Sequence, residues 1–186
     1  MRTRTQWQWA MVLAVLFIVD VSAQAMCEAC HGPGGNSASA EIPSIAGQPK
    51  TFLENQLVLI REGLRPSPQM LPIVKDMKDA EIARLAVHFS RLPAKSMESG
   101  AIDAKLARHG QEQAKALRCG VCHLADFRGQ HQVPRLAGQR ETYLTAEMRA
   151  YRDNQRKGGD TAMAAALYGV SDADIAALAH FLSRRK

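Results

Sequence analysis

Aromatic side chains are scarce in this chain of 186 residues, which contains five Phe, three Tyr and two Trp. Three of these lie in the first 25 residues, so seven aromatics and no Trp remain for the rest of the chain. Either the core is mostly aliphatic, or something other than side chains fills it. Long apolar runs are also missing, since no stretch reaches the ~18 residues of a spanning helix, which excludes a polytopic membrane protein. An apolar fraction of 46% and a charged fraction of 23% are globular values and exclude general disorder.

The first 25 residues have the pattern of a secretory signal peptide. Arg2 and Arg4 give a basic start, an apolar run covers 10–19, and Ala-Gln-Ala follows at 23–25. A retained membrane anchor is the alternative, but the apolar run is about half as long as a spanning helix requires. We therefore predict that residues 1–25 are cleaved and that the protein is exported to the periplasm. The mature chain would begin at Met26, and the loss of two Arg and one Asp would lower its net charge by one from the +6 of the whole chain.

All four cysteines of the chain fall in two copies of a Cys-x-x-Cys-His motif. This motif is read as the attachment signal for c-type haem. Two thiols at this spacing can each add to one of the two haem vinyl groups, and the next residue, His, is then held under the iron as an axial ligand. The candidate attachment residues are Cys27, Cys30, Cys119 and Cys122, and the candidate histidine ligands are His31 and His123.

Three other interpretations of the cysteines are weaker. A disulfide within each pair leaves the adjacent histidine unexplained twice. A zinc site made by both pairs would have to bridge the whole segment between Cys30 and Cys119, which is far longer than the usual spacer of about 15–20 residues. A thioredoxin-like redox site would need a strand–helix–strand pattern, which the sequence does not show. We therefore predict two covalently bound haem c (heme c) groups.

The two motifs stand at the head of two similar halves. Ile-Pro-Ser-Ile-Ala-Gly-Gln at 42–48 recurs as Val-Pro-Arg-Leu-Ala-Gly-Gln at 133–139. Later matches pair Phe52 with Tyr143, Arg61 with Arg152 and Arg65 with Arg156. Pro93 and Gly100 break the periodic pattern between the halves. The predicted segments are the signal peptide at 1–25, a first cytochrome c domain at 26–92, a linker at 93–103 and a second cytochrome c domain at 104–186.

The repeat also selects the sixth iron ligands, because methionine sulfur is a common partner of histidine in electron-transfer haems. Met70 and Met163 follow the motif histidine of their own half at almost the same spacing. Each also precedes, at an identical spacing, the Ile that the two final helical patterns share. Met77 and Met148 fall opposite Val and Leu, which suits ordinary core packing. The remaining histidines are expected to be surface or satisfied core residues: His88, His109, His131 and His180.

Every periodic segment of the chain has a helical pattern, and no alternating strand pattern occurs. We therefore predict an all-α fold with two tandem helical domains. Ser171 has the position of an N-cap, with acidic residues in the turn that follows it. The expected helices cover 49–62, 79–91, 103–117 and 140–155, and a last one begins at Ser171.

Taken in order, these elements resemble the cytochrome c4 family, two-domain di-haem cytochromes c of the bacterial periplasm. The resemblance covers nearly all of residues 26–186 and rests on the paired haem motifs, the paired Pro-x-[Ile/Leu]-Ala-Gly-Gln segments and a Met ahead of each final helix. It implies that each half is a small helical class I cytochrome fold wrapped round one covalent haem. It also implies the ligand pairs His31/Met70 and His123/Met163.

The same resemblance implies finer details of each half. The carbonyls of Pro43 and Pro134 resemble the groups that orient the ligand histidines in such folds. Gly110 lies where such folds pack the helix before the haem motif closely on the last helix. The first half departs from the pattern, because almost nothing precedes Cys27 once residues 1–25 are removed. That domain is then either truncated, with a more exposed haem, or residues 7–25 are retained as the missing helix.

Electron transfer without bond chemistry is the function that these features favour. With a protein ligand on both faces of each iron no substrate can bind there, and the sequence has no catalytic Ser/His/Asp or paired-carboxylate pattern, so we do not expect an enzyme. The expected partners are redox proteins, namely a membrane cytochrome complex, a terminal oxidase or a dehydrogenase, and not nucleic acid. Membrane association is expected only if residues 1–25 are retained. Two alternatives stay open: a peroxidase-like di-haem enzyme with one open haem, and a fixed electron-transfer subunit of a dehydrogenase or oxidase complex.

Overall fold

The computed structural model describes residues 23–98 and 100–186, and these residues form a helical fold. No β-strand occurs among them, and their one bridge-type pairing is isolated, between Gln130 and Val133. The all-α class predicted from the sequence is therefore confirmed. Most of the predicted signal peptide lies outside the described residues. The helices are η1 (Pro33–Gly35), α2 (Lys50–Arg61), α3 (Leu71–Val74), α4 (Asp79–Arg91), α5 (Ala104–Ala116), α6 (Cys119–His123), α7 (Glu141–Arg152), α8 (Thr161–Leu167) and α9 (Asp172–Ser183).

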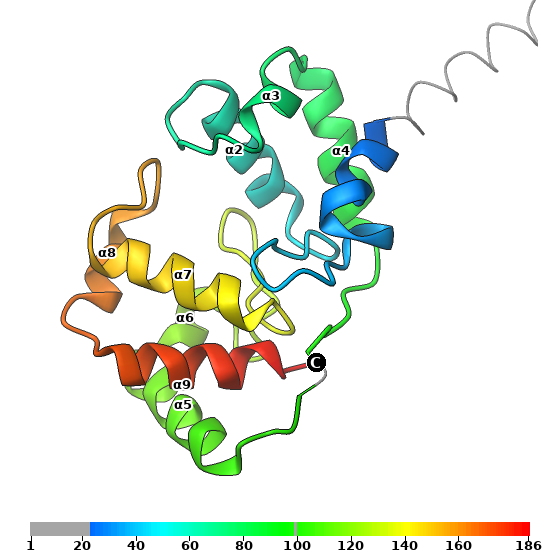
Figure 1. Cartoon of the computed structure of the whole chain (residues 1–186). Helices are drawn as coiled ribbons and strands as arrows, with labels where there is room; N and C mark the ends of the chain where they lie inside the picture. The colour runs from blue at the N-terminus through cyan, green and yellow to red at the C-terminus, as the bar shows by residue number, and fades with distance from the viewer. Residues whose placement is uncertain (1–22, 99) are drawn as a thin grey trace, which may run out of the picture.

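Figure 1 shows these helices in two lobes that are joined by one extended connection. The first lobe holds a helical segment at 23–31 together with η1 and α2–α4, and the second holds α5–α9. The described residues of the connection between α4 and α5 form no helix, and the predicted linker at 93–103 falls within it. None of the described helices is by itself long and apolar enough to cross a membrane; α8 and α9 reach that threshold only together, across a bend of 116°.

Helices α5 and α9 cross in close contact, which fixes the helix that leads into the second haem motif. Gly110 is buried at the crossing, and a Cβ built on it would lie 2.0 Å from the carbonyl oxygen of Ala177. Real Cβ atoms do not approach an oxygen so closely, so any larger residue would force the two helices apart. The position expected for Gly110 from the family resemblance is thus explained by helix packing.

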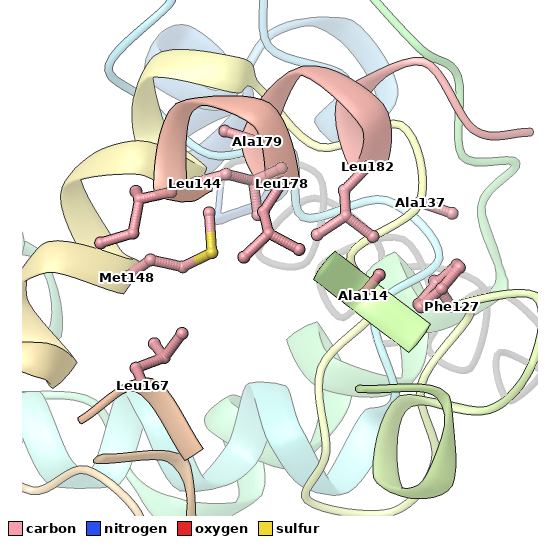
Figure 2. Close-up of a cluster of buried hydrophobic side chains, with 10 residues drawn as sticks. Ala114, Phe127, Ala137, Leu144, Met148, Leu167, Leu178, Ala179 and Leu182 are labelled. Carbon is pink, nitrogen blue, oxygen red and sulfur yellow. The ribbon is translucent and has the colours of Figure 1, made fainter. Parts of the chain in front are cut away.

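The core of the second half is a cluster of mainly aliphatic side chains, shown in Figure 2. Leu144 and Met148 reach it from α7, Leu167 from α8, and Leu178 and Leu182 from α9. All five are buried, and burial of such a side chain contributes about 1.5–3 kcal/mol. The scarcity of aromatics in the sequence is therefore reflected directly in the core.

The first half has a smaller buried cluster between α2 and α4. Ala23 and Cys27, from the helical segment at 23–31, pack against it. This segment is already helical upstream of Cys27. If residues 1–25 were cleaved, almost no residues would remain before Cys27 to form that part of the helix. Ala23 also precedes the predicted cleavage point and yet contacts the core. The buried residues of this cluster are Leu53, Leu85, Ala86 and Phe89.

The ends of the longer helices agree with the predicted boundaries. Helix α4 covers the predicted 79–91, while α2 and α7 lie within the predicted 49–62 and 140–155. The side chain of Asp103 caps α5 by accepting hydrogen bonds from two backbone N–H groups. Ser171 caps α9, where its Oγ accepts from the backbone N–H of Asp174 at 3.1 Å. The short helices α3, α6 and α8 were not predicted.

The two lobes meet at a cluster in which two equivalent arginines share two acceptors. Gln56 Oε1 accepts from Arg65 NH1 at 2.7 Å and from Arg156 NH2 at 2.9 Å. Glu147 accepts from Arg156 Nε at 2.6 Å and lies 3.4 Å from Arg65 NH2. Gln56 and Glu147 occupy equivalent places in the two halves, as the two arginines do. The contact therefore has an approximate internal two-fold symmetry, as closed interfaces between identical subunits have.

Candidate haem sites

Each Cys-x-x-Cys-His motif lies on a short helix that ends at its histidine. The first occupies the end of the segment at 23–31, and the second forms α6. Cys27 and Cys119 are half-buried and pack against the cores of their own halves, whereas Cys30 and Cys122 are exposed. All four cysteines are free. The arrangement thus leaves two unpaired thiols in each half, one against the core and one at the surface.

Both motif histidines are buried and bonded in the same way. His31 Nδ1 lies 2.8 Å from the carbonyl oxygen of Pro43, and His123 Nδ1 lies 2.8 Å from that of Pro134. A carbonyl only accepts, so Nδ1 carries the proton and Nε2 keeps its lone pair for a metal. Burial lowers the pKa of both histidines, although the carbonyl bond opposes this, and so favours the neutral ring that binds iron.

The two candidate methionine ligands lie in the loop between the long helix and the final helix of each half. Met70 is half-buried at the N-terminus of α3, and Met163 is half-buried within α8 and packs against the second core. Their local structures differ, because α8 already includes Met163 whereas α3 begins directly after Met70. Met70 nevertheless has a right-handed helical backbone, with φ −88° and ψ −30°, so the two methionines differ in their place in the short helix and not in backbone conformation.

One arginine in each half closes the loop that carries the methionine. Arg61 NH1 donates to the carbonyl of Met77 at 2.9 Å, and Arg152 NH1 donates to the carbonyl of Val170 at 3.1 Å. The same guanidinium groups also pair with the first residues of α4 and α9 at 2.8 and 2.7 Å. Met77 and Val170 are thus structurally equivalent, and the two candidate ligands precede them at an identical spacing.

The other methionines and histidines have surroundings of their own. Met77 packs against the first core, as the equivalent Val170 packs against the second, and Met148 is 6% exposed within the second core. His109 pairs with an aspartate of α9, and His180 is buried and bonded on both ring nitrogens. His88 stacks edge-on against Phe89, and His131 is exposed. These contacts agree with core or surface roles for all of them.

The residues around the motifs fit a covalent haem in each half. Free thiol pairs, a neutral buried histidine and a half-buried thioether are the groups that such a haem requires. A further feature that fits is Arg135, which is 5% exposed and has a buried Nε with no hydrogen-bond partner among the described residues. Its guanidinium bonds only to backbone carbonyls there, and burial without a carboxylate lowers its pKa to about 10. The anionic propionates of a haem would supply the missing acceptor charge.

Comparison with known proteins agrees with this geometry. The family model for cytochrome c matches residues 107–186, and the model for subunit III of cbb3-type cytochrome c oxidase matches residues 21–88. Cytochrome c4 of Thiocapsa roseopersicina is 30% identical over 88% of this chain and 88% of its own length. The chain belongs to the cytochrome c4 family. The resemblance inferred from the motifs is thereby confirmed.

Two further relatives of this cytochrome c4 family member are informative. The crystal structure of reduced recombinant cytochrome c4 from Pseudomonas stutzeri matches with a TM-score of 0.80 at 27% identity, over 90% of this chain and 98% of that one. The thiosulfate dehydrogenase electron acceptor of Thiomonas intermedia is 31% identical over 86% of this chain and 78% of its own length. The protein is thus a di-haem c-type cytochrome with two covalently bound haem c groups, and it transfers electrons.

Sequence reasoning did not identify all the residues that support these sites. The repeat pairs Arg61 with Arg152 but does not predict that they close the methionine loop. It also pairs Gln48 with Gln139 and predicts no contact for either of them. The signal that was available is the recurrence of an identical polar residue at the same place in both halves of an otherwise divergent repeat.

Proposed function

We propose that this cytochrome shuttles single electrons between redox proteins in the periplasm through two haems ligated by His31/Met70 and His123/Met163. The hydrogen bond from each motif histidine to a proline carbonyl, 2.8 Å long in both halves, is the observation that carries the proposal. It fixes the tautomer and ring orientation in which Nε2 is available to iron.

The methionine assignment rests on the equivalence of the two loops. The carbonyls of Met77 and Val170 accept the same arginine hydrogen bond, so these two positions correspond, and Met70 and Met163 lie at the same distance before them. A core role for Met77 is supported by its packing, which matches that of Val170. Thioether ligands raise the reduction potential of a haem, which suits an electron carrier.

A bound haem would supply a reversible one-electron change at its iron. The free thiols of the two motifs would hold the haems, and the pairs His31/Met70 and His123/Met163 would ligate their irons. An iron with two protein ligands would have no free position for a substrate. We therefore propose a carrier and not an enzyme.

The proposed location and partners rest on separate observations. The basic start, apolar run and Ala-Gln-Ala tripeptide within residues 1–25 support export. A relative named as the electron acceptor of thiosulfate dehydrogenase supports a dehydrogenase as electron donor. The same relative favours a second candidate, in which the cytochrome is a bound subunit of such a dehydrogenase. Purification from the periplasm without salt tests this, since a stoichiometric complex would favour the subunit over the shuttle.

Visible spectroscopy of the purified holoprotein tests the ligand assignment. We expect two covalent low-spin haem c groups per chain and, in the oxidised form, the weak sulfur-to-iron charge-transfer band. Met70→Leu and Met163→Leu should each remove about half of that band, while the matched controls Met77→Leu and Met148→Leu should keep it. High-spin features or rapid carbon monoxide binding by the reduced wild-type protein would instead indicate an open haem and favour a peroxidase-like enzyme.

A further inference from the structure

A single peptide group joins the first motif histidine to a glutamine of the opposite half. The carbonyl of Pro43 accepts the hydrogen bond of His31 Nδ1 at 2.8 Å. The N–H of the same peptide group belongs to Ser44, and it donates to Gln139 Oε1 at 2.7 Å. Gln139 also donates from Nε2 to the carbonyl of Ser44 at 2.8 Å, so its amide clasps this residue on both sides.

The second motif histidine is connected in the same way in the opposite direction. The carbonyl of Pro134 accepts from His123 Nδ1 at 2.8 Å, and the N–H of that peptide group belongs to Arg135. Arg135 N–H donates to Gln48 Oε1 at 2.9 Å, and Gln48 Nε2 donates to the carbonyl of Arg135 at 3.0 Å. Gln48 and Gln139 are equivalent residues of the repeat. The two halves therefore exchange identical glutamine clasps.

All four clasp hydrogen bonds lie away from water. Ser44 is 0% exposed, Gln139 2%, Gln48 4% and Arg135 5%. A hydrogen bond in such surroundings is electrostatically stronger than in water, and successive bonds polarise one another. An N–H that donates to glutamine makes the carbonyl of its own peptide group a stronger acceptor. A stronger acceptor at Nδ1 makes the imidazole a more basic iron ligand.

We propose that each glutamine tunes the haem of the other half: Gln139 acts through the Pro43–Ser44 peptide on His31, and Gln48 acts through the Pro134–Arg135 peptide on His123. This inference rests on the proposed function, because it takes the two histidines as iron ligands. Gln48 and Gln139 are positioning residues, because each bonds the backbone beside the proline and not the histidine itself. No bond is made or broken, since the redox partner supplies the electron and the Nδ1 proton stays in place.

The sign of the effect follows from ligand basicity. A more basic imidazole stabilises the oxidised iron and lowers the reduction potential. Removing Gln139 should therefore raise the potential of the first haem and leave the second unchanged, and removing Gln48 should do the opposite. Successive hydrogen bonds strengthen one another only in part, so the effect should be modest. We expect the equilibrium constant for reduction to change by about two- to fourfold, which is about 18–36 mV at 59 mV per tenfold.

Redox titration of the holoprotein, followed by NMR of the haem methyl signals assigned to each half, measures the two potentials separately. Gln139→Leu should raise only the first-half potential, and Gln48→Leu only the second-half potential. Gln56→Leu is the matched control, because it removes a part-buried hydrogen bond between the halves, the one from Arg156, without touching either peptide group. It should shift neither haem in this crosswise manner.

A second substitution separates polarisation from loosening of the interface. Gln139→Glu keeps an acceptor for Ser44 N–H and adds negative charge, so the first-half potential should fall, whereas Gln139→Leu raises it. Shifts of the same sign in both variants, a shift in the haem of the mutated half, or an equal shift with Gln56→Leu would each overturn the proposal. Failure of the proposed ligands is recognised separately, because the unmodified protein would then lack two low-spin His/Met spectra.

Discussion

Replacing Gly110 by alanine should destabilise the second half of the molecule through the contact between α5 and α9. The added Cβ would lie 2.0 Å from the carbonyl oxygen of Ala177 and 2.7 Å from Cβ of Phe181. Ordinary contact begins near 3.4 Å, so one helix must move by more than an ångström. The obstacle is backbone, which cannot rotate away as a flexible side chain can.

The magnitude follows from two opposing contributions. Overpacking of a tight contact costs about 1–3 kcal/mol and more when backbone must shift, while Gly to Ala within a helix gains about 1 kcal/mol. We expect a net loss of about 2 kcal/mol in the free energy of unfolding, which lowers Tm by about 8–16 °C for a domain of this size. Because α5 leads directly into α6, the loss should disturb the haem held by Cys119.

Thermal unfolding of the holoprotein, followed by far-UV circular dichroism and by haem absorbance, measures this effect. Gly120→Ala is the matched control, since Gly120 is also helical and its added Cβ would make only ordinary contacts with Ala125, at 3.6 Å from Cα and 3.9 Å from N. This control should unfold at the wild-type temperature or slightly above it. Equal Tm values for the two variants would refute the close approach of α5 and α9 as the reason for glycine at 110.

Two further predictions concern the haem and acid. A Cys119→Ala/Cys122→Ala variant cannot attach the second haem, and its second half should lose its cooperative unfolding transition. The reason is that a unit below about 90 residues has little core of its own. An unchanged thermal transition in circular dichroism would contradict this. Hydrogen bonds from Arg152 lower the pKa of Asp172 below its ordinary value of 3.8, and bonds from Ser171 and then His109 lower that of Asp174. Both carboxylates therefore stabilise the fold above about pH 4 and lose this contribution as pH falls through their folded pKa, so Tm should drop below pH 4 and Asp174→Asn should weaken that drop.

The longer helices could be predicted because local signals fix them. The core-facing residues of α2, α4, α7 and α9 recur at helical spacing, and Ser171 and Asp103 mark starts where their side chains do cap the backbone. The short helices α3 and α8 have no periodic stripe, since four to seven residues are too few for one, and the N-cap that Asp160 gives α8 does not predict a helix by itself. The turns that follow them are fixed by hydrogen bonds from Arg61 and Arg152 to the carbonyls of Met77 and Val170, which no local pattern contains.

The haem attachment residues could be predicted for a different reason. The spacing of two thiols and a histidine is dictated by the cofactor, so the motif is visible without any knowledge of the fold. The methionines have no such fixed spacing and were selected only because the repeat offered two copies to compare. The contact between Gln48 and Arg135 could not be predicted at all, because a repeat aligns each half with the other and says nothing of how the two dock.

The docking itself explains why the same segment recurs in both halves. In a closed two-fold interface, residue i of one unit contacts residue j of the other, and j contacts i. The clasps obey this rule within one chain, since Gln48 binds Arg135 and Gln139 binds Ser44. The two glutamines are equivalent residues of the repeat, and so are Ser44 and Arg135.

The symmetry is broken where two equivalent residues differ in size and charge. Ser44 is small and neutral, whereas Arg135 adds a buried cation. A positive charge opposes the oxidised iron, so the haem nearer to the Arg135 guanidinium should have the higher potential. The near-symmetric fold thus provides two similar sites, and we expect single differences between equivalent residues, such as Ser44 and Arg135, to make their potentials unequal.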